Sequence, residues 1–336
     1  MDTLLFAINS VLPIILLIAL GYFLKKIKFV DDNFLKIANK YVYRIALPAL
    51  LFYNIYKIES FDNILWNQII FAVIGILLLF IIGMISVKLF VPEKKQKGVI
   101  VQAIFRANFA IIGIPLAKAI GGDIAVVYLS MIAAIAIPLM NILSVIALTM
   151  YIEERQPGQF KKTLVKIIKN PLIIGIALGL FVLLIRSFIP KDNEGFYIFS
   201  LQKDLRFFYL PIKWLGETTS PIALIVLGGG FHFYIIKPLL RQIFIGTLLR
   251  AVISPLLILS LAVILDKYVD YFNFNYLVYP AYISLFASPT AITGAVMAKE
   301  MNNDYDLANQ CVVWTTLISI VTIFITVLVF KLMNFI

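Results

Sequence analysis

The sequence has little of what a soluble enzyme needs for chemistry. Among its 336 residues there is one cysteine, Cys311, and one histidine, His232. A single cysteine excludes an intrachain disulfide and any cysteine-rich metal site, and a single histidine argues against a histidine metal cluster. No Ser–His, paired-Asp or His–Glu constellation falls within the apolar runs. We therefore expect no metal, no cofactor and no enzymatic activity.

Charge is also scarce, because only 14% of the residues are charged, 62% are hydrophobic and the mean hydropathy is +0.99. A soluble domain is typically about half apolar and a quarter charged, so the chain is predicted to be an integral membrane protein. The net charge of +11 could suggest nucleic acid. The basic residues, however, lie in loops between apolar runs, which membrane topology explains better. No nucleic-acid partner is expected.

The apolar runs predict ten transmembrane helices joined by linkers too short to form a soluble domain. The first run has no basic segment before it and no small-residue cleavage site, so we interpret it as a retained helix and not a signal peptide. The ten predicted spans are 3–24, 35–57, 66–90, 98–120, 123–150, 171–189, 209–235, 239–265, 276–298 and 306–333.

Lysine and arginine indicate the orientation in the cell membrane. They are most frequent in the loops after the first, third and fifth spans, and cytoplasmic loops carry such an excess. These loops are therefore predicted to be cytoplasmic, which places both termini outside the cytoplasm.

An internal repeat predicts how the spans are organised. Three sequence matches occur in the same order in both halves: residues 13–21 with 171–179, Pro48 with Pro221, and Pro115 with Pro289. They predict a first five-helix repeat over 1–150, a short cytoplasmic linker over 151–170 and a second five-helix repeat over 171–336. Since five is odd, the second repeat enters the membrane from the other side, and the repeats are inverted.

The fourth span is not a plain hydrophobic helix. Arg106 and Asn108 place polar groups about halfway across the membrane, and Gly113 with Pro115 is expected to break the backbone hydrogen bonds there. In a bilayer, such a break is tolerated only against protein or a water-filled cavity.

A second break is predicted in the ninth span, at Ser288, Pro289 and Thr290. Interrupted spans at corresponding positions of two halves point to the substrate site of a transporter. A half-helix that starts after a break presents free N–H groups and the positive end of its dipole, which suits an anion. The alternative is that both prolines merely kink packed helices.

Three arginines lie near the centres of spans, where a charge costs at least a few kcal/mol. They are Arg44, Arg106 and Arg250, whereas all 18 acidic residues lie in predicted loops or near span ends. Each arginine could bond carbonyls freed at a broken helix or reach an interface, and this interpretation is favoured for Arg44 and Arg250. For Arg106, attraction of an anionic substrate is equally supported.

The polar residues near the breaks complete the predicted site. Asn108 could bind a carboxylate or hold two helices together. Ser288 and Thr290 could add hydroxyl contacts or bond their own helix, and Asn141 in the fifth span is a weaker candidate. The predicted substrate-binding residues are Asn108, Gly113, Ile114, Pro115, Ser288, Pro289, Thr290, Arg106 and Asn141.

Several of these motifs resemble the auxin efflux carrier family, which includes plant PIN-FORMED auxin transporters and bacterial and archaeal members described as malate or malonate permeases. The segment from Asn108 to Leu116 resembles the family's fourth-helix motif, and the segment from Pro289 to Asn302 resembles its ninth helix. Residues 39–48 resemble the second helix, and 169–171 the start of the sixth. Together these matches extend over most of the chain.

The resemblance implies an all-α polytopic fold of ten helices, with helices 4 and 9 broken and crossing, as in sodium/proton antiporters and bile-acid symporters. It also implies a scaffold of helices 1, 2, 6 and 7, a moving part of helices 3–5 and 8–10, and a homodimer through the scaffold. Asn108 and the backbone around Pro115 and Pro289 would hold the substrate carboxylate. The acid–lysine pair of plant carriers is absent after Trp66, so its role cannot be transferred.

The sequence thus predicts a secondary transporter that exports a small organic anion, either an auxin-like monocarboxylate or a malate- or malonate-like dicarboxylate. Export is favoured because an anion that leaves a negative-inside cell gains about 2.3 kcal/mol per charge per 100 mV. The alternatives are a sodium- or proton-coupled organic acid symporter and, from another class, a non-transporting membrane receptor.

Overall fold

The structure, a computed structural model, describes residues 2–58, 65–151, 169, 171–190, 197–231, 237–272, 274 and 276–336. The fold is helical, as predicted, and these described residues contain no β-strand. The predicted linker over 151–170 lies outside them except for Tyr151 and Lys169, and so does His232.

Membrane-length helices confirm that the chain is a polytopic membrane protein. Of the described residues, five helical stretches are long and apolar enough to cross a bilayer: Thr3–Lys26, Trp66–Phe90, Phe109–Thr149, Lys237–Tyr268 and Tyr305–Leu332. Shorter apolar helices lie at Pro171–Ser187 and Tyr276–Phe286. The count of ten spans and the inverted repeat stay predictions.

The chain divides into two compact units. Unit 1 contains Met1–Leu16, Asn67–Thr163 and Phe231–Ile336, and unit 2 contains Leu17–Trp66 and Leu164–Gly230. Helix α1 (Asp2–Lys26) contributes to both, because the division falls between Leu16 and Leu17.

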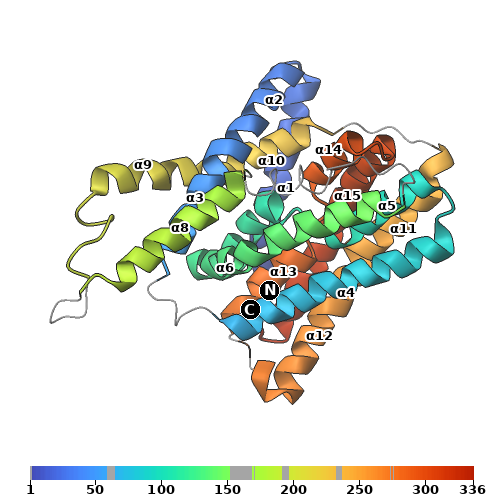
Figure 1. The fold of residues 1–336 in the computed structure, drawn as a ribbon. Helices are drawn as coiled ribbons and strands as arrows, with labels where there is room; N and C mark the ends of the chain where they lie inside the picture. The colour runs from blue at the N-terminus through green and yellow to red at the C-terminus, as the bar shows by residue number, and fades with distance from the viewer. Residues whose placement is uncertain are drawn as a thin grey trace. The chain divides into compact units, whose positions relative to one another are not determined.

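Among the described residues, unit 2 contains the last part of α1 and five further α-helices. Helix α3 runs beside α8 (Figure 1), and Gly175 of α8 makes this possible, since a Cβ there would lie 2.5 Å from the backbone oxygen of Pro48. The span predicted over 209–235 is interrupted at Thr218. The five helices are α2 (Asp32–Tyr41), α3 (Leu47–Tyr56), α8 (Pro171–Ser187), α9 (Arg206–Glu217) and α10 (Thr219–Gly229).

Unit 1 carries both of the breaks predicted from the sequence. Its long helix α6 bends sharply at Gly122, where φ is +66° and ψ is −159°, so its two parts correspond to the predicted fourth and fifth spans. After α1, the α-helices of unit 1 in the described residues are α4 (Trp66–Phe90), α5 (Lys94–Phe105), α6 (Ile114–Thr149), α11 (Leu240–Leu248), α12 (Ser254–Tyr268), α13 (Tyr279–Phe286), α14 (Ile292–Glu300) and α15 (Tyr305–Leu332).

In the part of the chain that the structure describes, three five-residue π-helical segments interrupt the α-helices. They are η1 (Val42–Ala46), η3 (Phe109–Gly113) and η5 (Leu249–Ile253). Each ends two residues before a proline, namely Pro48, Pro115 and Pro255. Proline lacks the N–H that would bond the carbonyl four residues earlier, and the wider π turn accommodates this loss without ending the helix.

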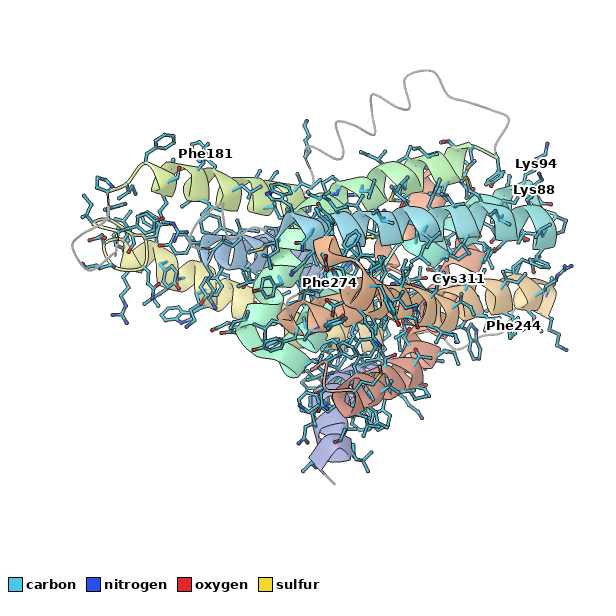
Figure 2. All side chains as sticks on the ribbon, turned by 90° about the horizontal axis from the view of Figure 1, so that it is seen from below. Lys88, Lys94, Phe181, Phe244, Phe274 and Cys311 are labelled. Carbon is cyan, nitrogen blue, oxygen red and sulfur yellow. The ribbon has the colours of Figure 1, made fainter. Side chains whose placement is uncertain are left out.

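Exposed side chains fit a lipid environment. Phe181 on α8 is 58% exposed and Phe244 on α11 is 65% exposed, and each points away from its helix (Figure 2). Lys88 at the end of α4 and Lys94 at the start of α5 lie close to the same end of unit 1 (Figure 2). Unit 1 thus carries basic residues at the end where α4 passes to α5.

Candidate functional site

The first break lies between α5 and η3, upstream of its predicted position. Arg106 has φ −86° and ψ 95°, and Asn108 has φ −85° and ψ 45°, so both leave the helix. Gly113 and Pro115, in contrast, lie in continuous helix, where the missing N–H of Pro115 produces a π turn. The expectation that these two residues break the backbone was therefore wrong by about one to two turns.

The second break lies between α13 and α14, where the sequence predicts it, and it pairs with the first. Ala107 and Thr290 form an isolated antiparallel bridge. The N–H of Asn108 donates to the carbonyl of Pro289 at 2.7 Å, and the N–H of Ala291 donates to the carbonyl of Arg106 at 3.0 Å. Each break thus satisfies backbone groups that the other leaves free, as a buried backbone requires.

Arg250 binds the carbonyl ends of both half-helices that lead into the breaks. Its side chain is fully buried. Nη1 donates to the carbonyl of Ile104 at 3.1 Å, Nη2 to that of Leu285 at 2.9 Å, and Nε to that of Ser288 at 2.8 Å. The sequence favoured such carbonyl bonding for Arg250.

Arg106 is held by neutral oxygen atoms of α6 and α14. Its guanidinium donates to Asn141 Oδ1 at 2.7 Å, Ser144 Oγ at 2.6 Å, Thr293 Oγ1 at 3.2 Å and the carbonyl of Met140 at 3.3 Å. Asn141 is therefore joined to the breaks through Arg106. These contacts give Arg106 a structural task in this conformation.

The hydroxyl groups beside the second break bond the protein itself. Thr290 Oγ1 donates to the carbonyl of Ala103 at 2.6 Å, and Ser288 Oγ donates to the carbonyl of Ser284. The backbone N–H of Thr290 donates to Thr315 Oγ1 at 3.1 Å. A carboxylate needs donors, and in this arrangement both hydroxyl protons are already used.

Asn108 differs from these residues because its side-chain amide is buried but unpartnered. The residue is 4% exposed, and its Nδ2 atom has no hydrogen-bond acceptor among the described residues. The next helix starts at Phe109, and no side chain caps it. The first N–H groups of a helix have no acceptor within that helix, so the amide and these N–H groups form one cluster of hydrogen-bond donors.

The remaining predicted residues shape the start of this helix. A Cβ at Gly113 would lie 2.9 Å from the carbonyl oxygen of Ser284, so only glycine lets α13 approach so closely. Ile114 is buried and Pro115 is half-buried in the first turn of α6. They position the backbone and offer no polar side-chain atom.

Several polar residues near the two breaks were not predicted from the sequence. Ser284 is fully buried, and its Oγ has no partner among the described residues. Ser144 and Thr293 bind Arg106. A signal existed for two of them, because Ser144 follows Asn141 by one helical turn and Thr293 comes three residues after Thr290 of the second break. Residues close in the helix lie on one face.

The donors suit an anion better than a metal ion. In the part of the chain that the structure describes, no group of three or more His, Cys, Asp or Glu side chains lies close enough together to hold a metal. Amide and backbone N–H groups, in contrast, bind carboxylate or phosphate oxygens. The half-helix α14 also starts without a side-chain cap, and its positive dipole end lies at the second break, which pairs with the first.

Comparisons with known proteins agree with a membrane function. The family described as "Membrane transport protein" matches residues 6–327 of this chain. An uncharacterized transporter of Methanothermobacter thermautotrophicus is similar, with 22% identity over 317 residues that cover 94% of this chain and 95% of that protein.

Proposed function

The chain belongs to the membrane transport protein family, the family of the auxin efflux carriers, and from this premise we propose that it exports a small organic anion across the cell membrane. The substrate class is a monocarboxylate similar to auxin or a dicarboxylate similar to malate or malonate. Both termini would lie outside the cytoplasm.

The observation that carries this proposal is the unpartnered amide of Asn108. A buried donor without an acceptor costs roughly 1–3 kcal/mol, and native proteins keep few such groups. Asn108 directly precedes the uncapped start of η3, and its backbone N–H pairs the first break with the second. A substrate carboxylate that accepts from this amide and from the free N–H groups would satisfy both.

Alternating access would follow from the two units. Unit 1 contains the predicted spans 3–5 and 8–10 together with residues 3–16 of span 1, and unit 2 contains the predicted spans 2 and 6, most of span 7 and the end of span 1. This division supports the proposal that unit 1 moves with the substrate while unit 2 forms the scaffold and a homodimer. All the donors of the proposed site belong to unit 1.

The test is a thermal-shift screen of the purified full chain against malate, malonate and indole-3-acetate, with cations held constant. An acid present at 100 times its dissociation constant stabilises the fold by about 2.7 kcal/mol. We expect one acid to raise the melting temperature, and Asn108→Ala to lose that shift while remaining folded.

Asn54→Ala is the matched control. Asn54 is also buried and its Nδ2 is also unpartnered among the described residues, but it lies on α3 of unit 2. The control variant should keep the shift. If no acid shifts the wild-type melting temperature but sodium does, the sodium-coupled symporter replaces our proposal.

A further inference from the structure

Arg250 is a buried cation that the anion site described above does not use. It lies in the π segment η5, and it is the largest fully buried side chain among the residues that the structure describes. A cation at this depth is costly unless it is paired. Its partners are therefore informative.

All three hydrogen bonds of Arg250 go to backbone carbonyls at the two breaks. Ile104 lies in the last turn of α5, Leu285 lies in the last turn of α13, and Ser288 lies in the second break. The guanidinium therefore joins the carbonyl ends of two half-helices that are far apart in the sequence.

The charges at this place are complementary. Each helix C-terminus carries the equivalent of about half a negative charge, so the two ends together match about one positive charge. Crossing broken helices in membrane transporters use such carbonyl ends to coordinate Na⁺ or H⁺. In this chain the guanidinium already occupies them.

We propose that Arg250 is a resident counter-charge, which holds the negative ends of α5 and α13 together and makes a bound metal cation unnecessary there. Arg250 is thus a positioning residue, because it acts through the breaks and not on the substrate. This inference rests on the proposed function, anion transport. It predicts that the carrier binds and transports its anion without sodium.

The first test uses the wild-type full chain in detergent without any acid. Sodium chloride is replaced by choline chloride at constant ionic strength and pH. We expect an unchanged melting temperature, because the site is filled by Arg250. A melting temperature that rises with sodium would overturn the proposal. Since no acid is present, this result is independent of the substrate screen.

The second test empties the site. Arg250→Ala should melt roughly 5 °C or more below the wild type, because it leaves buried carbonyls unpaired. Millimolar methylguanidinium, which has the same donor group, should restore part of that loss. A variant that melts like the wild type, or that methylguanidinium does not stabilise, would contradict the proposal.

Arg44→Ala is the matched control for cation effects unrelated to the site. Arg44 also lies in a π segment that precedes a proline, but its side chain is exposed. The melting temperature of the Arg44→Ala variant should not rise when methylguanidinium is added. Arg250→Lys keeps the charge and should remain independent of sodium, whereas a sodium-stabilised Lys variant would count against a resident charge.

Discussion

The guanidinium of Arg106 donates to oxygen atoms of neutral groups on α6 and α14. Among them is the hydroxyl of Ser144, which in turn donates to the carbonyl of Met140 at 2.6 Å. A hydrogen bond donated by a charged group is stronger than a hydrogen bond between two neutral groups. The network therefore fixes the first break against α6, at the level of single side chains.

Ser144→Ala tests this network at the residue scale. The change removes the acceptor of one guanidinium N–H, so we expect a loss of about 1–3 kcal/mol in the free energy of unfolding. Chemical denaturation of the purified protein measures it.

Ser130→Ala is the control, since Ser130 lies on the same helix, is equally buried and bonds the carbonyl of Val126 at 2.8 Å. Ser130→Ala should lower the free energy of unfolding clearly less than Ser144→Ala does. Equal losses would mean that the bond to Arg106 adds nothing.

Residue types were predictable from the sequence, but their environments were not. Arg44 and Arg250 both fall near the centre of a predicted span, yet Arg44 is exposed and Arg250 is fully buried. The difference depends on which helices surround each residue. That depends on long-range packing, which the local hydrophobic pattern does not contain.

Helix α4 shows how far an apolar run defines an element, because the predicted span 66–90 coincides with Trp66–Phe90. The first break shows the limit. Pro115 only widens a turn, whereas the chain leaves the helix at Arg106, whose carbonyl accepts a hydrogen bond from the N–H of Ala291. Residues so distant in sequence give no local signal of their pairing.

At the scale of elements, glycines allow the close packing of α1 and α10 within unit 2. A Cβ at Gly228 would lie 1.8 Å from the carbonyl oxygen of Ile18, and one at Gly21 would lie 2.0 Å from that of Ile225. Small residues let transmembrane helices approach in this way.

Gly228→Ala should therefore force the two helices apart and destabilise the protein by about 3 kcal/mol, measured as a fall in melting temperature. Gly230→Ala is the matched control, because a Cβ there would meet no atom closer than 3.5 Å. If the two variants have the same melting temperature, the close approach of α1 and α10 does not contribute to the stability of the protein.

At the scale of the whole molecule, the chain carries a net charge of +11, and the proposed anion site consists of neutral donors. With Arg250 bound to carbonyls, movement of unit 1 would carry the charge of the anion itself. Transport should then follow the membrane potential and not a sodium gradient. One charge across 100 mV is worth about 2.3 kcal/mol.

Potential-driven uptake into liposomes that contain the purified chain tests the central claim most directly. The probe is whichever of malate, malonate and indole-3-acetate stabilises the protein, and a potassium diffusion potential makes the interior positive without sodium. We expect accumulation of about 50-fold per charge at 100 mV with the wild type, and none with Asn108→Ala. Uptake that ignores the potential, or that appears only with a sodium gradient, would contradict the account.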